Sequence, residues 1–374
     1  MRIIAVQTGL SPLSVLGGTI TDREFLTRLA DRGVEVHLLT EAGEPVVEHE
    51  RFVVHRWHRR LRKRLPYVGN ADVALDLRRL LAEVGPVDWI RFNSPYSVGL
   101  GTVAAGGGHR IWGSYLHLED YLSWRLIDRW LPSRCDLITC LSDDTRRDLV
   151  ARCPSADHAA NIVVPMGIDT ARFDLARAHR EEVRASHGIG DEEVVILFVG
   201  SLIARKGIAD LAAAWRQLGN RPGVRLLLVA KPAGAEETRI VEELVREDDR
   251  VIHVPSVRYE EVPRYFAASD IFFFPTHLEG YGIVVGEAMA SRLPVVTTRA
   301  QGVREVIAEN ETALAADVGD AAELSRLLDR LLADRALRDR LGRAGRARVE
   351  AHFTWDRIMD RLMERLGDPG ARAN

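Results

Sequence analysis

The segment 275–298, PTHLEGYGIVVGEAMASRLPVVTT, constrains the fold of this chain more than any other stretch. The apolar run 271–274 precedes it, the apolar residues 294–296 lie near its end, and a glycine-bearing loop, 280–282, lies between them. This order predicts a strand, a loop, a helix and a second strand, so the loop follows the carboxyl end of a parallel strand. Open α/β sheets bind ligands in the crevice outside those strand ends. The segment therefore predicts an α/β fold with a ligand site at this loop.

Two carboxylates, Glu279 and Glu287, lie on either side of that loop. The backbone N–H groups that open the helix near Ile283 are expected to face an anion, which the helix dipole also favours. Glu287 lies about one turn into the same helix, and therefore close to the ligand. The segment thus predicts a site for a phosphate-bearing ligand with a polyol attached.

Composition narrows the class of protein. A length of 374 residues, with 46% hydrophobic and 28% charged residues, favours two globular domains. A formal net charge of −3 gives no reason to expect nucleic acid as a partner. The three cysteines show no metal-ligand spacing, and no run of 18 apolar residues suggests a membrane span. The N-terminal residues MRIIAVQTGL are expected to form a strand rather than a signal-peptide core. We therefore expect a cytoplasmic protein.

The first domain is expected to open with a βαβ unit. Strand 2–7 is followed by the loop 8–18 and an amphipathic helix, 20–32, which Gly33 ends before the next strand. The loop lacks G-x-G-x-x-G, so a nicotinamide dinucleotide site is not supported. Its Gly17 and Gly18 fit either a flexible turn or a backbone that a substrate approaches closely.

Two further features of the first domain admit both a structural and a functional interpretation. The basic block 55–67, HRWHRRLRKRLPY, fits a solvated face, an anionic substrate or an acidic membrane surface. His117 follows the predicted strand 110–115, where it could reach a crevice or serve the structure alone. Ser142 is the predicted N-cap of the helix 143–151.

The second domain is expected to be a fresh α/β series. The polar segment 174–193 shows no strand pattern and is predicted to be a linker. Predicted strands 194–199, 224–230, 251–254 and 271–274 alternate with predicted helices 207–218, 236–246 and 259–268. The chain is predicted to be helical from 321, and the apolar spacing of 355–366 suggests packing against the first domain. We therefore assign 1–175 with 355–374 to the first domain and 190–354 to the second.

A second glycine loop carries the clearest cationic signal. In GSLIARKG, 200–207, Arg205 and Lys206 lie between a predicted strand and the start of a helix. Adjacent cations at a helix N-terminus suit a diphosphate, because side chains and backbone can then bind the same anion. Exposed Arg-Lys pairs are common, so this loop alone is weak evidence for a diphosphate site. The carboxylates of 279–287, predicted on the same sheet, strengthen that interpretation. Cations for a diphosphate and carboxylates for hydroxyls together indicate a sugar nucleotide.

At this point the chain resembles a retaining glycosyltransferase of the GT-B architecture, and is most similar to glycosyltransferase family 4 (group 1). The most specific motif is the E-x7-E element EGYGIVVGE, 279–287. GSLIARKG, the run IVVPMGIDTARF, the loop with Gly17 and Gly18, and the helix after HFTW accompany it nearly end to end. The resemblance implies two Rossmann-like domains that face each other across a cleft, with a C-terminal helix that returns to the first domain.

The resemblance also implies roles for individual residues. Arg205 and Lys206 would bind the donor diphosphate and stabilise it as leaving group, Glu287 would hold the ribose hydroxyls, and Glu279 would face the transferred sugar. The other implied donor-binding residues are Gly17, Gly18, Gly280, Tyr281, Gly282 and Ile283. His117 matches the family histidine near the sugar, although its context, YLHLED, departs from the usual form.

The implied reaction needs neither a cofactor nor a metal. In this family the acceptor is thought to attack on the face that the leaving group departs from, and the leaving phosphate takes the acceptor proton. The chain contains no D-x-D, the usual divalent-metal signature of the other glycosyltransferase architecture, so we expect metal independence. The donor is expected to be a UDP-sugar on family frequency alone.

Several alternatives stay open. A sugar-nucleotide epimerase or a phosphorylase shares the architecture, but neither Lys63 nor Lys231 has a convincing setting for the pyridoxal phosphate of a phosphorylase. A non-catalytic sugar-nucleotide-binding module is the non-enzyme alternative. The acceptor is either a small hydroxylated molecule, such as an aminocyclitol or another natural-product intermediate, or a phospholipid at a membrane surface. The block 55–67 favours the lipid, and Glu119 and Asp120 suit a cationic acceptor; the small acceptor is preferred.

Overall fold

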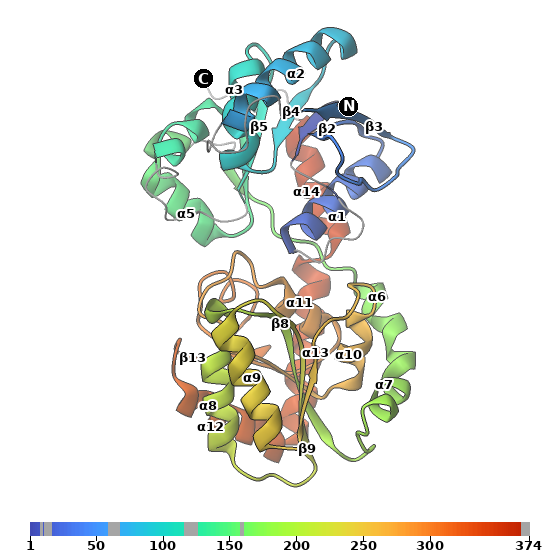
Figure 1. Ribbon diagram of the computed structural model, residues 1–374, viewed down its shortest axis with the longest axis vertical. Coiled ribbons are helices and arrows are strands. Elements are labelled where there is room, and N and C mark those ends of the chain that lie inside the picture. The colour runs from blue at the N-terminus through green and yellow to red at the C-terminus, as the bar shows by residue number, and fades with distance from the viewer. Residues whose placement is uncertain (8–9, 11–16, 59–67, 116–125, 158–160, 368–374) are drawn as a thin grey trace. The chain divides into compact units, whose positions relative to one another are not determined.

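The computed structural model describes residues 1–7, 10, 17–58, 68–115, 126–157 and 161–367. The chain divides into two compact units, Met1–Pro165 with Ile358–Asn374, and Met166–Arg357. Each unit is built on one parallel sheet with helices against it (Figure 1). The predicted α/β class with two Rossmann-like domains is therefore confirmed.

The sheet of the first unit has seven strands in the order β3-β2-β1-β4-β5-β6-β7, and every neighbouring pair is parallel. The strands are β1 (Arg2–Val6), β2 (Glu35–Glu41), β3 (Phe52–Trp57), β4 (Trp89–Phe92), β5 (Ile111–Tyr115), β6 (Leu137–Cys140) and β7 (Asn161–Val163). The order reverses between β1 and β4, so this sheet has its topological switch point there.

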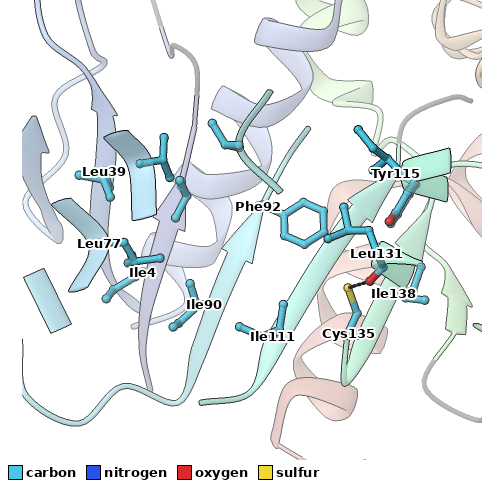
Figure 2. Close-up of a cluster of buried hydrophobic side chains, with 14 of the residues drawn as sticks. Ile4, Leu39, Leu77, Ile90, Phe92, Ile111, Tyr115, Leu131, Cys135 and Ile138 are labelled. Carbon is cyan, nitrogen blue, oxygen red and sulfur yellow. Dashed lines mark hydrogen bonds between the residues drawn. The ribbon is translucent and has the colours of Figure 1, made fainter. Parts of the chain in front are cut away.

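Alternate residues of these strands supply the core on one face of the first sheet. Ile4 of β1, Ile90 of β4 and Ile111 of β5 belong to one buried cluster, and Leu77 of helix α2 also belongs to it (Figure 2). Because successive strand residues point to opposite faces, the intervening residues pack on the other side of the sheet. Both faces of the central strands are buried, as is usual for a parallel sheet, whereas Val53 and Val54 of the edge strand β3 are exposed.

The helices of the first unit are α1 (Gly17–Asp31), α2 (Val68–Val84), α3 (Leu100–Ala105) and α5 (Asp143–Arg152), with a π-helical turn at Pro95–Gly99 and 3₁₀ turns at Leu131–Arg134 and Pro154–Ala156. Of these helices, α1 and α5 begin close to their predicted positions, and α2 and α3 were not predicted. The N-cap prediction is confirmed, because Ser142 Oγ accepts the Thr145 N–H at 3.1 Å. Gly17 and Gly18, expected at the end of the preceding loop, are instead the first two residues of α1.

The sheet of the second unit has six strands in the order β10-β9-β8-β11-β12-β13, again all parallel. The strands are β8 (Val194–Leu202), β9 (Val224–Pro232), β10 (Val251–Val254), β11 (Ile271–Phe274), β12 (Val295–Thr298) and β13 (Ala313–Ala316). The helices are α6 (Thr170–Ala176), α7 (Arg180–Ser186), α8 (Ile208–Leu218), α9 (Ala235–Glu247), α10 (Val262–Ala268), α11 (Ile283–Ala290), α12 (Ala321–Ala333) and α13 (Arg335–His352). The strand order reverses between β8 and β11.

The segment 174–193, predicted to be a linker, is folded into the second unit and that prediction is wrong. It contains the end of α6, a 3₁₀ turn and all of α7. One of its charged residues, Arg184, is buried, and its guanidinium donates to the carbonyl oxygens of Ala268 at 2.9 Å and Glu193 at 2.6 Å. A charged side chain that satisfies buried backbone acceptors is part of the core, although its residue type suggests solvent.

Helix α14 (Trp355–Gly367) begins in the second unit and belongs to the first unit from Ile358 onward. Its apolar residues Ile358 and Leu362 are buried, and its Leu366 carbonyl accepts the Trp89 indole N–H at 3.2 Å. The expectation that the C-terminal helix returns to the first domain is therefore confirmed. Of the helices in the described residues, none is long and apolar enough to cross a membrane.

Candidate active site

The two predicted loops leave neighbouring strands at the switch point of the second sheet. Strand β8 pairs with β11 through Ile196–Ile271 and Leu197–Phe272, in parallel register. The loop with Arg205 and Lys206 follows β8, and the loop with Glu279 follows β11. Both loops therefore lie at the carboxyl edge of the sheet, where the strand order reverses, which is the usual ligand position in this class of fold.

Lys206 and Glu279 form the central contact of the site. Lys206 Nζ lies 2.5 Å from Glu279 Oε1, and Arg205 Nη1 lies 3.6 Å from Glu279 Oε2. The Lys206 side chain is 13% exposed, and desolvation lowers its pKa while the Glu279 carboxylate opposes that change. The structure thus brings together three of the predicted site residues, two cations and one carboxylate.

Thr276 and Phe274 also contact these groups, and the sequence analysis did not identify Thr276. The Thr276 hydroxyl lies 2.8 Å from Glu279 Oε1 and 2.9 Å from the Arg205 carbonyl oxygen. The Lys206 ammonium lies 4.9 Å from the centroid of the Phe274 ring, within reach of a cation–π interaction. Thr276 lies two residues after the buried strand β11. Its position just beyond the end of a strand could have indicated that it belongs to the site.

The backbones of the two loops approach each other closely. Gly207 has φ 67°, and a Cβ at this position would collide with the Pro275 carbonyl oxygen. Gly302 has φ 78°, and a Cβ there would collide with the Glu279 carbonyl oxygen. Both positions therefore require glycine, for conformation and for space. This packing fixes the chain on both sides of the Lys206–Glu279 pair.

Helix α11 carries the second predicted carboxylate. Its N-cap is Gly282, in the left-handed conformation with φ 68°, and the Tyr281 ring packs edge-on against Phe353 with centroids 6.1 Å apart. Glu287 lies in the second turn of α11 and is buried, and burial raises its pKa to about 7. The site therefore holds a carboxyl group whose charge changes near neutral pH.

Two residues that sequence reasoning missed surround Glu287. The Tyr259 hydroxyl lies 3.5 Å from Glu287 Oε1, and the charge of Arg172 partly offsets the effect of burial on the Glu287 pKa. The Arg172 guanidinium lies 4.1 Å from the centre of the Tyr259 ring and donates to the Tyr259 carbonyl oxygen. Arg172 belongs to the run IVVPMGIDTARF, but the sequence does not show that it lies near Glu287.

The remaining predicted residues lie elsewhere or outside the description. Gly280, Gly282 and Ile283 form the turn into α11, as expected. Gly17 and Gly18 belong to the first unit, at the start of α1. His117 and the larger part of the basic block, 59–67, lie outside the described residues. Within those residues, no group of three or more His, Cys, Asp or Glu side chains has the geometry of a metal site.

Two family models match this chain in succession. Residues 17–172 match the model of Glycosyltransferase Family 4, and residues 179–348 match that of the group 1 glycosyl transferases. Their boundaries correspond approximately to the two units of the structure.

Relatives and solved structures agree with these matches. The alpha-maltose-1-phosphate synthase of Mycolicibacterium smegmatis is 30% identical over 275 residues, which cover 69% of this chain and 67% of that protein. A GDP-mannose-dependent monoacylated alpha-(1-6)-phosphatidylinositol monomannoside mannosyltransferase of Corynebacterium glutamicum is 27% identical over 358 residues, 91% of each chain. The sucrose-phosphate synthase structure from Thermosynechococcus elongatus superposes with a TM-score of 0.80 at 25% identity, over 98% of this chain and 99% of that one. Anabaena HepE in complex with UDP and glucose gives a TM-score of 0.78 at 18% identity, over 98% and 100%.

The chain therefore belongs to glycosyltransferase family 4 and has the GT-B architecture. It is an enzyme that transfers a sugar from a nucleotide donor.

Proposed function

We propose that this enzyme is a retaining glycosyltransferase that moves a sugar from a UDP-sugar to a hydroxyl of a small polar acceptor. The acceptor class is an aminocyclitol or a similar polyol intermediate of natural-product biosynthesis. The observation that carries the proposal is the Lys206–Glu279 contact at the switch point of the second sheet. A cation for the diphosphate and a carboxylate for sugar hydroxyls lie within hydrogen-bonding distance of each other.

Donor binding exchanges the partners of these groups. The diphosphate takes the place of Glu279 beside Lys206 and Arg205, because two negative phosphates neutralise both cations better than one carboxylate does. Glu279 is then free to accept hydrogen bonds from the sugar. Glu287 accepts from the ribose hydroxyls, and the backbone at Gly282 and Ile283 faces the donor at the start of α11.

The chemistry follows from where charge develops. The bond between the anomeric carbon and the diphosphate oxygen breaks, so the sugar becomes positive and the departing oxygen negative. Arg205 and Lys206 lie where the negative charge appears, and they stabilise the transition state more than the ground state. The acceptor oxygen attacks from the side that the diphosphate leaves, and its proton passes to the departing phosphate. No enzyme carboxylate forms a covalent intermediate.

In this proposal the reaction needs no cofactor and no metal, because Arg205 and Lys206 supply the positive charge at the leaving group. Transfer is therefore expected to continue in the presence of a chelator. Loss of most of the activity in chelator, with recovery on adding a divalent metal, would contradict metal independence and leave the donor site in place.

A second candidate function is GDP-mannose-dependent transfer to a phosphatidylinositol-type glycolipid. The relatives in Corynebacterium glutamicum and Mycobacterium tuberculosis favour it, because both are phosphatidylinositol monomannoside mannosyltransferases. The basic block 55–67 adds charge that suits an anionic membrane surface. Flotation with anionic liposomes separates the candidates. Binding that disappears when Arg59, Arg60, Arg62 and Arg64 become Ser favours the lipid acceptor.

A nucleotide panel tests the donor. A ligand that binds only the folded state raises the melting temperature in proportion to its affinity and concentration. We expect UDP to stabilise the wild-type enzyme more than GDP or ADP does, and we expect Lys206→Ala to abolish the shift. A larger shift with GDP would favour the second candidate. Donor hydrolysis measured with and without polyol acceptors then distinguishes a transferase from an epimerase or a binding module.

A further inference from the structure

His277 touches both of the loops that form the donor site. It comes directly after Thr276 in the loop that follows β11. Its backbone N–H donates to the Arg205 carbonyl oxygen at 2.8 Å. Its ring Nε2 lies 2.6 Å from Oδ2 of Asp210, in the first turn of α8. One residue therefore connects the β11 loop to the turn that carries Arg205 and to the helix behind it.

These contacts hold both the cationic turn and the first turn of the helix that follows it. Arg205 and Lys206 lie in the 3₁₀ turn Ala204–Lys206, and Gly207 joins this turn to α8. The His277 N–H holds the turn itself, whereas the His277 ring holds the first turn of α8, beyond Gly207. Gly207 has no side chain to restrict its own backbone, so the bracing must come from its neighbours.

The charged group in contact with the His277 ring is Asp210 of α8. The carboxylate accepts from the imidazole N–H, and a hydrogen bond to a carboxylate is stronger than one between two neutral groups.

The brace is too exposed to contribute much to global stability. The His277 side chain is 41% exposed and that of Asp210 is 17% exposed, so solvent screens the pair. Its effect is therefore expected to be local, on the position of the turn. This distinguishes it from a pair that stabilises the fold as a whole.

We propose that His277 is a positioning residue for the donor, which holds the Arg205–Lys206 turn in place through its backbone N–H to Arg205 and its ring contact with Asp210. This inference rests on the proposed function of Arg205 and Lys206 in binding the diphosphate. It adds a determinant of donor affinity that lies outside the residues touching the donor.

The test is calorimetric titration of the full chain with UDP, or with GDP if GDP is the nucleotide that binds the wild type. His277→Ala is expected to weaken nucleotide binding about tenfold, equivalent to about 1.4 kcal/mol. His277→Gln offers an amide N–H to Asp210, so it is expected to keep most of the affinity.

The comparison of His277→Gln with His277→Ala separates the ring contact with Asp210 from the rest of the side chain. Affinity that returns in His277→Gln shows that the hydrogen bond to Asp210 carries the effect. His187→Gln is the matched control, because His187 lies at the end of α7 and its ring contacts Ser186 and the Val183 carbonyl. That variant is expected to bind as the wild type does.

A double-mutant cycle tests whether the pair acts as a unit. If His277 acts through Asp210, then Asp210→Ala, His277→Ala and the double variant are expected to weaken binding by similar factors. Additive losses, or wild-type affinity in His277→Ala, would overturn the inference. Thermal melting of each variant confirms that it is folded.

The failure of this inference is distinguishable from failure of the proposed donor site. If Lys206→Ala binds the nucleotide as tightly as the wild type, the donor site itself is wrong. If Lys206→Ala loses binding and His277→Ala does not, only the role of His277 is wrong. In steady-state kinetics His277→Ala is expected to raise the donor KM by a larger factor than it lowers kcat.

Discussion

Each unit of this enzyme places a cation and a carboxylate close to the switch point of its sheet, but the two pairs differ in exposure. In the first unit, Arg91 of β4 donates to Asp22 of α1 at 2.6 Å, and both side chains are 2% exposed. In the second unit, Lys206 and Arg205 meet Glu279 with side chains that are 13%, 50% and 10% exposed. The first pair is enclosed, whereas the second has a cation that solvent or a ligand can reach.

The surroundings explain the difference. The Arg91 guanidinium lies 4.9 Å from the centroid of the Phe25 ring and 5.2 Å from that of Trp112, and its Nη2 also donates to Ser114 Oγ at 3.2 Å. Its Nε and Nη1 atoms are buried and have no hydrogen-bond partner among the described residues. An enclosed ion pair therefore holds α1 on the sheet, while an accessible pair is available for exchange with a ligand. The same fold feature is thus enclosed in one unit, and in the other it is accessible, as the proposed role in donor binding requires.

The largest expected effect is on the enclosed pair. Arg91→Leu leaves the Asp22 carboxylate buried without its cation, so the free energy of unfolding is expected to fall by about 3 to 5 kcal/mol. Urea denaturation followed by circular dichroism measures this. Asp22→Asn together with Arg91→Leu removes both charges and is expected to recover part of the loss. If Arg91→Leu lowered the unfolding free energy by less than about 1 kcal/mol, the Arg91–Asp22 pair would not be what holds α1 on the sheet.

The accessible pair is expected to matter for turnover instead. Lys206→Ala removes a cation at the leaving group, and the barrier is expected to rise by roughly 3 kcal/mol, by analogy with the loss of one oxyanion donor. Single-turnover rates with saturating donor measure the change. Its unfolding free energy is expected to change much less than that of Arg91→Leu. Unchanged turnover in Lys206→Ala would refute its role.

The buried Glu287 lies between these extremes, because it is enclosed and, among the described residues, its side chain is hydrogen-bonded to the Tyr259 hydroxyl rather than to a cation. Its folded-state pKa of about 7 is above the ordinary value of 4.5, so the protonated form is favoured in the folded protein. The associated stability is complete below the ordinary value and is lost as pH rises through about 7. Glu287→Gln, which cannot ionise, is expected to exceed the wild type in unfolding free energy at alkaline pH by about 1 to 2 kcal/mol.

Chemical denaturation at acid and alkaline pH measures this effect. Near pH 4 the wild type and Glu287→Gln are expected to be about equally stable, because both then carry a neutral side chain. The same substitution is expected to weaken donor binding. A wild-type protein whose stability advantage over Glu287→Gln grows with pH would contradict the assigned direction of the pKa shift.

The smallest expected effect on stability is at Arg205. Its side chain is half exposed, so Arg205→Ala is expected to change the unfolding free energy by less than about 0.5 kcal/mol. Donor affinity is nevertheless expected to fall, because we propose that this cation binds the diphosphate. If Arg205→Ala lowered the unfolding free energy as much as it lowered the free energy of donor binding, the contrast between the enclosed pair of the first unit and the accessible pair of the second would not hold.

The sequence predicted the second unit better than the first, for physical reasons. Strand, glycine loop and helix follow each other in 271–290, and each carries a local signal, so the Glu279 loop and α11 lie where we expected them. Strand β3 was not predicted, because its pattern includes His55 and Arg56 on an edge of the sheet. Edge strands bury less, so their hydrophobic pattern is weaker.

Contacts between distant residues were beyond the sequence. Arg172 beside Glu287, and Asp210 beside His277, depend on which helices the fold places next to each loop. Likewise, Arg184 resembled a solvent-exposed linker residue because only the folded structure shows the carbonyl oxygens that it binds. Local patterns predicted the elements and the residue types of the site, and tertiary packing supplied their partners.

The central claim, that the accessible pair of the second unit binds the donor diphosphate, is tested most directly by titrating nucleoside diphosphate into two matched variants. Lys206→Ala removes the proposed ligand-binding cation at the start of α8. Arg216→Ala removes a cation near the other end of the same helix, where Arg216 Nη2 pairs with Glu247 at 2.8 Å. We predict that Lys206→Ala loses nucleotide binding and that Arg216→Ala binds as the wild type does. Equal affinities in the two variants would contradict the assignment of the donor site.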